Sequence, residues 1–344
     1  MTQYDVADRP ATADSRPEWV SLAGVWAVVA VFAVITLVRS AQVGIGLRDP
    51  HGEIFVSRIS LSAGIFVALV ALDTARRARR ARPHGWSWHA AAGVLRARWT
   101  PRRLALTWSG LLAYHLTYFC YHNLKSWDVL NVPQDRMLDG WDRALFFGHS
   151  PAVLLHDLLG QGASAWVLMF FYESFSTIVC VSFVAALVFP DRFRDGIVFI
   201  ASAIWVWIFG VGSYYLIPSL GPFHVAPQDY AGLPHMMIQD TQARYMGQRA
   251  FLLAHPQDPH AFAQISAFAS LHVGVTTVIT LMARYYRQRL LHRALCVFLA
   301  ITIVATVYLG WHYAVDDVAG LFIGWLAVRL GVLMVAPRGG ARSR

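Results

Sequence analysis

Long apolar runs constrain the fold of this chain more than any other feature of its sequence. A run of about 20 predominantly apolar residues crosses a bilayer as a helix. Such runs appear near residues 19–39, 54–74, 104–122, 164–189, 196–217, 267–286, 291–311 and 314–335. Charged residues make up only 14% of the chain, against roughly 25% in a soluble domain. The sequence therefore predicts an all-α, polytopic membrane protein with about eight transmembrane helices.

Basic residues gather in the segments between these runs. They appear in "ARRARRARPHGWSWHAAAGVLRARWTPRR", "PDRFRDG", "ARYYRQRLLHR" and the final "RGGARSR". Eight spans place all four segments on one side, which the positive-inside rule makes the cytoplasm. We therefore expect a multi-pass protein of the cell membrane with both termini cytoplasmic and residues 123–163 and 218–266 extracytoplasmic. The net charge of +9 then reflects topology rather than binding to nucleic acid.

A histidine and a carboxylate stand four residues apart between the last two runs, in "HYAVD". On a helix such a pair shares one face, so Asp316 is placed to accept a hydrogen bond from His312. That bond fixes the imidazole tautomer and leaves the other ring nitrogen free to attack or to move a proton. Asp317 points about 100° further round the helix, which favours Asp316 as the orienting group.

Two other helix ends on the same side carry polar motifs. In "FASLHVG", Ser270 is a good N-cap and brings His272 to a helix N-terminus, where anions such as phosphate bind well. In "YLIPSLGPFH", Gly221 and Pro222 form a turn that leaves room for a ligand against the backbone. We expect the three ends to converge on one extracytoplasmic active site.

These motifs resemble those of the type 2 phosphatidic acid phosphatase superfamily, and most closely its branch of inositol phosphorylceramide synthases. "ASLHVG" is similar to the superfamily's P-S-G-H motif, and "HYAVD" to its H-x-x-x-D motif. "YLIPSLGP" and "LDGWDRALFFGHSP" resemble segments of that branch. The resemblance covers about residues 104–335 and implies a core of six helices preceded by two additional ones.

The resemblance implies a role for each motif residue. His312 is the nucleophile that forms a phosphohistidine, Asp316 orients it, and His272 protonates the leaving oxygen. Ser270, Gly221 and Pro222 bind the substrate. No metal and no cofactor is implied.

This sequence departs from the superfamily's phosphatases at the positions where their basic residues hold the phosphate. Thr306 stands where they place an arginine, and the first motif has no basic residues. Other cations must then meet the phosphate charge, and the extracytoplasmic segments offer Lys125, Arg244 and Arg249. Lys125 is the first candidate because it ends a span at the right depth.

The chain is accordingly predicted to consist of four regions. Residues 1–18 form a disordered cytoplasmic tail, residues 19–103 two additional transmembrane helices with a basic cytoplasmic loop, residues 104–336 the catalytic membrane domain, and residues 337–344 a basic cytoplasmic tail.

Four functions remain open at this point. The first is a phosphotransferase that takes a phospholipid in the outer leaflet and passes a phospho-headgroup to an alcohol acceptor, either a hydroxylated lipid or a polyol. The second is a lipid phosphatase that hydrolyses a phosphomonoester. The third is a b-type haem membrane protein with His272 and His312 as axial ligands. The fourth is a protein that binds or moves lipids without any chemistry.

Overall fold

The computed structural model describes residues 18–81 and 87–335, which form helices and contain no strand. The α-helices are α1 (Glu18–Val43), α2 (Val56–Ala81), α3 (Trp88–Arg98), α4 (Pro101–Asp128), α5 (Asp135–Leu145), α6 (Pro151–Leu159), α7 (Ala163–Val188), α8 (Phe193–Leu216), α9 (Pro222–Val225), α10 (Met237–Ala254), α11 (Leu271–Tyr285), α12 (Arg289–Tyr308) and α13 (Ala314–Val335). Short 3₁₀ helices cover Pro50–Gly52 and Pro227–Tyr230. The two predicted tails lie outside the described residues, except for Glu18.

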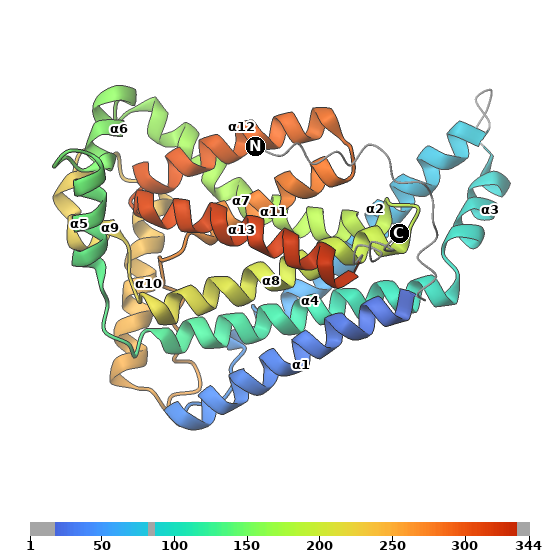
Figure 1. Cartoon of the computed structure of the whole chain (residues 1–344), viewed down its shortest axis with the longest axis horizontal. Coiled ribbons are helices and arrows are strands. Elements are labelled where there is room, and N and C mark those ends of the chain that lie inside the picture. Colours follow the sequence, from blue (N-terminus) through green and yellow to red (C-terminus); the bar gives the residue numbers. More distant parts are fainter. Residues whose placement is uncertain (1–17, 82–86, 336–344) are drawn as a thin grey trace, which may run out of the picture.

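The long helices α1, α2, α4, α7, α8, α11, α12 and α13 run side by side between two ends of one bundle (Figure 1). At one end the Ser21 hydroxyl on α1 donates to the Val335 carbonyl of α13. At that end the Tyr286 hydroxyl, just after α11, also donates to the Asp195 carbonyl of α8. The short helices α5, α6, α9 and α10 gather at the opposite end (Figure 1).

Six segments within the described residues are long and apolar enough to cross a membrane: Glu18–Val43, Pro50–Ala81, Ala163–Val188, Phe193–Leu216, Arg289–Tyr308 and Ala314–Val335. The prediction of a polytopic membrane protein is therefore confirmed, but the count of eight spans is not. Helix α4 buries polar side chains such as His115, Thr117 and Asn123, which lower its hydropathy. Helix α11 is only 15 residues long, because residues 267–270, predicted to be helical, are not.

The core is built around α8, which packs against α4, α7, α11 and α13. Helices α11 and α13 approach each other through glycines. A Cβ added at Gly320 would lie 2.4 Å from the Ser270 carbonyl oxygen, and one at Gly324 would lie 2.4 Å from the Gly274 carbonyl oxygen. Small residues permit such close backbone contact between membrane helices. This contact fixes the spacing between the segments that carry His272 and His312.

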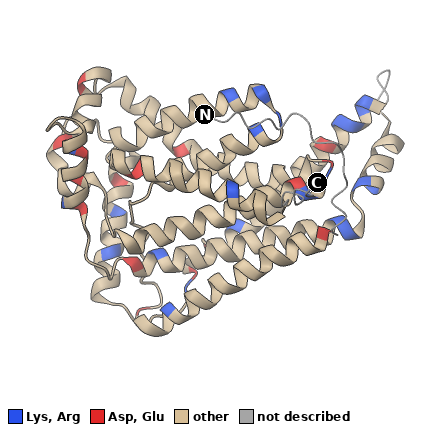
Figure 2. Ribbon diagram, viewed as in Figure 1, with Lys and Arg blue, Asp and Glu red and all other residues tan. Residues whose placement is uncertain are grey.

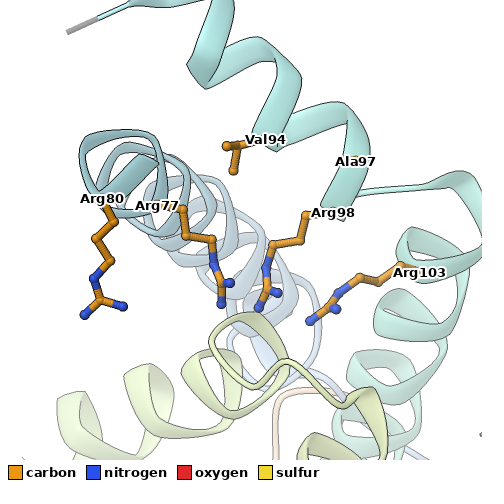
Figure 3. Close-up of a pocket in the computed structure, with 6 residues that line it drawn as sticks. All are labelled: Arg77, Arg80, Val94, Ala97, Arg98 and Arg103. Carbon is orange, nitrogen blue, oxygen red and sulfur yellow. The ribbon is translucent and has the colours of Figure 1, made fainter. Parts of the chain in front are cut away.

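Basic residues gather at the end of the bundle where α3 lies (Figure 2). Arg77, Arg98 and Arg103 come from α2, α3 and α4 and lie next to one another (Figure 3). Arg98 donates to the carbonyl oxygens of residues 188–190, and Arg103 to that of Pro190. Arg77 pairs with Asp191 at 2.7 Å. These side chains satisfy the open carbonyls at the C-terminus of α7 and anchor that helix.

Candidate active site

His312 lies in the loop of residues 309–313, one turn after α12 ends and just before α13 begins. Asp316 sits in the first turn of α13 and turns back toward this loop. Its Oδ2 accepts the Tyr313 backbone N–H at 3.0 Å and lies 3.3 Å from His312 Nδ1. The predicted contact is therefore present, but a loop and a helix start produce it rather than one continuous helix face.

The imidazole of His312 is almost fully buried, with 6% exposure. Burial lowers the pKa of His312 to about 4, and the charge of Lys125 acts in the same direction, while Asp317 opposes it. The side chain also interacts with the backbone of Ala267. A neutral imidazole whose Nδ1–H faces a carboxylate carries its lone pair on Nε2. This is the state that a histidine nucleophile needs.

His272 is the second residue of α11 and faces His312, with ring centroids 5.9 Å apart and the planes at 61°. Two aromatic side chains from α7 hold it there. The ring of Tyr172 stacks on it at 4.3 Å and 23°, and the ring of Phe175 packs at 4.3 Å. The structure therefore brings together the two histidines that the motifs predict, and α7 fixes the orientation of His272.

Ser270 is the N-cap of α11, as predicted, and its hydroxyl accepts the Val273 N–H at 3.4 Å. The side chain is completely buried and also interacts with the Asp317 carboxyl. The Ser270 backbone N–H donates to the Asp316 carbonyl oxygen at 3.0 Å. Ser270 thus ties α11 to α13, and its contact with a substrate remains a prediction.

Asp317 is buried and is no surface carboxylate. Its Oδ2 accepts a 2.9 Å hydrogen bond from the Thr306 hydroxyl. Thr306 is the position where an arginine is absent, and its hydroxyl also lies 2.8 Å from the Ile303 carbonyl oxygen. Asp317 therefore connects the end of α12 to α13, whereas Asp316 contacts His312.

The Gly221–Pro222 turn packs against the His312 loop. Gly221 has φ +110, and a Cβ there would lie 2.7 Å from the Trp311 carbonyl oxygen. The Gly221 N–H donates to Asp135 Oδ1 at 2.9 Å, and the Ser219 hydroxyl accepts the Phe268 N–H at 2.8 Å. The three predicted motif segments therefore converge, but Gly221 makes room for the backbone of Trp311 rather than for open space.

Two carboxylates on α5 hold the Gly221 turn and the start of α13 in place. They are not among the site residues predicted from the sequence. Asp135 accepts the N–H groups of Leu220 and Gly221 and the Tyr313 hydroxyl. Asp142 accepts the N–H groups at the start of α13, at 2.7 and 3.0 Å. Both side chains are buried. Their spacing of seven residues, two helical turns on one face, is the signal that points to them.

The three predicted cationic residues have different positions. Lys125, near the end of α4, has its Nζ 5.6 Å from the Tyr214 ring centre and lies within electrostatic range of both His272 and His312. Arg244 on α10 is exposed and lies over the Tyr245 ring at 5.5 Å. The structure places Arg249 further along α10, with no contact to either histidine.

No three His, Cys, Asp or Glu side chains within the described residues lie close enough to hold a metal ion. A haem would require both histidines to present a nitrogen to one iron. His312 Nδ1 faces Asp316 instead, and His272 packs against Tyr172 and Phe175. The residues present do not fit a haem.

A scan against protein-family models decides the family. The model described as the PAP2 superfamily matches residues 136–330, which is more than half of the chain and includes both histidines and Asp316. The chain belongs to the PAP2 superfamily. Members of this superfamily are phosphatases and phosphotransferases. A search of curated proteins and a search of solved structures found no match.

The PAP2 match leaves helices α1 to α4 outside it. Two of these four helices nevertheless reach the PAP2 site region. Helix α4 contributes Lys125, and helix α2 packs against α4 and α7. Part of the site region therefore comes from helices that the family match does not cover.

Proposed function

We propose that this PAP2 protein is an integral membrane phosphotransferase that acts on a lipid phosphate through a phosphohistidine at His312. The main support for this proposal is the 3.3 Å contact between His312 Nδ1 and Asp316 Oδ2, with the His272 ring facing His312. One buried histidine oriented by a carboxylate and a second one opposite supply a nucleophile and a general acid–base.

The chemistry follows from this arrangement. His312 Nε2 attacks phosphorus, and the bond from phosphorus to the leaving oxygen breaks. Protonated His272 gives its proton to that oxygen. In the second half, neutral His272 takes the proton of an acceptor hydroxyl, the acceptor oxygen attacks the phosphohistidine, and His312 leaves. Lys125 offsets the negative charge on the phosphoryl oxygens.

The absence of an arginine at position 306 favours a phosphodiester lipid as the donor. An arginine-bearing site suits the doubly charged phosphomonoester, but Thr306 here is bonded to Asp317. A phosphodiester lipid carries less charge, and its transfer to a hydroxylated lipid or polyol needs less clamping. This supports the likeness to inositol phosphorylceramide synthases, with hydrolysis of a phosphomonoester as the alternative.

The site is proposed to face the extracytoplasmic side of the cell membrane. Arginines gather at the opposite end of the bundle (Figure 2), and the positive-inside rule assigns that end to the cytoplasm. In a cysteine-free background, cysteines replace Phe147 and Leu290, which are 94% and 82% exposed. An impermeant thiol reagent is expected to label Phe147→Cys in intact cells and to miss Leu290→Cys. The reverse pattern would place the site in the cytoplasm.

One experiment tests the reaction. The purified protein is incubated with labelled phosphatidylinositol, phosphatidylglycerol or phosphatidic acid, together with a panel of polyols and a ceramide, and products are identified by mass spectrometry. We expect headgroup transfer from a diester lipid and an acid-labile phosphohistidine that His312→Ala lacks. Faster phosphate release from phosphatidic acid would assign a lipid phosphatase, and label elsewhere than on His312 would refute the mechanism.

A further inference from the structure

A small cavity that contains a few polar side chains lies beside the catalytic pair, between α2, α4 and α7. It has a volume of about 40 Å³, and its lining includes Arg58, Ser62, Tyr114, His115, Tyr118 and Phe175. Phe175 also packs on the His272 ring, so the cavity begins where the catalytic site ends. Ser176, which lines it on α7, is exposed. The cavity therefore opens sideways, toward the surface that the bundle presents to lipid.

Arg58 brings an uncompensated charge into this cavity. It lies on α2, in one of the apolar membrane segments. Within residues 18–81 and 87–335 its one hydrogen-bond partner is Cys180 Sγ at 3.9 Å. The phenols of Tyr114 and Tyr118 lie within electrostatic range, and no carboxylate of these residues forms an ion pair with it. An arginine within an apolar span is costly and marks a functional group by default. It needs an oxygen acceptor that this part of the chain does not supply.

A second side chain in the cavity lacks a partner independently of Arg58. His115 is 2% exposed, and its Nε2 lies 3.0 Å from the Ser62 hydroxyl. Its Nδ1 is buried and has no hydrogen-bond partner within the described structure. Buried polar nitrogens are rarely left unsatisfied. Two groups from two helices thus leave hydrogen-bonding capacity open in the same small space.

The lining selects a ligand rich in acceptor oxygens. Guanidinium and phenol groups donate, and no carboxylate lines the cavity. Along α7, Cys180 lies five residues after Phe175, which is a rise of about 7.5 Å. Phe175 packs on His272, and Cys180 contacts Arg58. Arg58 therefore contacts a ligand about 7.5 Å further from this end of the bundle than His272 does. In a diacyl phospholipid the ester carbonyls follow the phosphate by a few bonds toward the chains. They are neutral acceptors at this depth.

We propose that this cavity is a subsite for the acyl ester carbonyls of a diacyl lipid substrate, with Arg58 as the principal donor. The inference rests on the proposed function, because the phosphate must lie between His272 and His312. It assigns a substrate-positioning role to α2, which lies outside the PAP2 match. The lipid enters from the side, with its chains left in the bilayer and its ester groups held by Arg58.

The test compares two short-chain phosphatidic acids and two matching phosphatidylglycerols, one of each pair with ester and one with ether linkages. Turnover and thermal stabilisation are measured for the wild type, Arg58→Met, Arg58→Lys and a control, Arg329→Met, which removes an exposed arginine from α13. The wild type should prefer ester over ether lipid in kcat/KM by about tenfold, as expected for a hydrogen bond to a charged group. Arg58→Met should lose this preference through slower use of the ester lipid, Arg58→Lys should recover part of it, and Arg329→Met should keep it.

The outcomes separate this inference from the proposed function. Turnover of both lipids without an ester preference would overturn the subsite and leave the phosphotransfer standing. Loss of both activities equally in Arg58→Met would also overturn it, because Arg58 would then act on the phosphate or on folding. Preferential stabilisation by ester lipid that Arg58→Met abolishes would support the subsite even if neither lipid is turned over.

Discussion

Replacing Gly324 by alanine is expected to slow catalysis without touching a catalytic residue. The new Cβ would lie 2.4 Å from the Gly274 carbonyl oxygen and 2.8 Å from Thr277 Cβ, where ordinary contacts begin at 3.4 Å. The two helices must therefore separate by about 1 Å. Because α11 carries His272 and α13 begins just after His312, this separation moves the proposed general acid away from the proposed nucleophile. A misplacement of about 1 Å can cost roughly 10²-fold in rate.

The matched control is Gly212→Ala on α8, where an added Cβ meets nothing within 4 Å. Overpacking in Gly324→Ala is expected to lower the free energy of unfolding by about 1–3 kcal/mol, whereas Gly212→Ala gains helix propensity. The assay is kcat on the preferred lipid in detergent, together with thermal unfolding and size-exclusion profiles. If Gly324→Ala stays folded and its kcat lies within about twofold of that of Gly212→Ala, the helix spacing does not control the site.

Further results are expected for three carboxylates, for the dependence on pH and for chelation. Asp316→Asn should lower kcat by a large factor, as loss of an orienting carboxylate does in other histidine mechanisms. Asp317→Asn should mainly lower the unfolding temperature, and the opposite order would show that Asp317 orients the histidine. Burial lowers the pKa of His312 to about 4, so the neutral nucleophile persists as pH falls, and the acid limb of kcat/KM should lie near pH 4; a limb near 6.5 would show a solvated imidazole. Asp135→Asn should destabilise the fold by about 1–3 kcal/mol in chemical unfolding, since the carboxylate holds Gly221, and an unchanged midpoint would contradict this. Activity should survive EDTA, and its loss with rescue by one divalent metal would refute the phosphohistidine mechanism.

The sequence alone predicts the features that depend on local composition and spacing. Apolar runs predicted the membrane helices, and the last span, residues 314–335, matches α13. The Ser270 N-cap and the contact between His312 and Asp316 followed from short-range rules about helix starts and histidine–carboxylate spacing. The pairing of the two histidines followed from placing three helix ends on the same side of the membrane, and the family resemblance implied the same pairing.

Long-range pairing explains what the sequence left open. Asp135 and Asp142 accept hydrogen bonds from backbone N–H groups 85 and 172 residues further along the chain. No local sequence pattern predicts those partners. The start of α11 was placed too early because residues 267–269 are apolar, yet their backbone bonds to Ser213 and Ser219 instead of forming a helix. The sequence gives no partner for Asp317, because Thr306 lies on the preceding helix.

The two carboxylates of α5 have a consequence for how the protein exchanges its ligands. One short helix pins both the loop before α9 and the start of α13, so neither wall of the site can swing outward alone. Ligand exchange would then follow the sideways direction between helices that the proposed lateral entry uses. Turnover should then depend little on the viscosity of the aqueous phase and strongly on the packing order of the surrounding acyl chains. The membrane itself, rather than a protein loop, would set the rate at which lipid reaches the histidines.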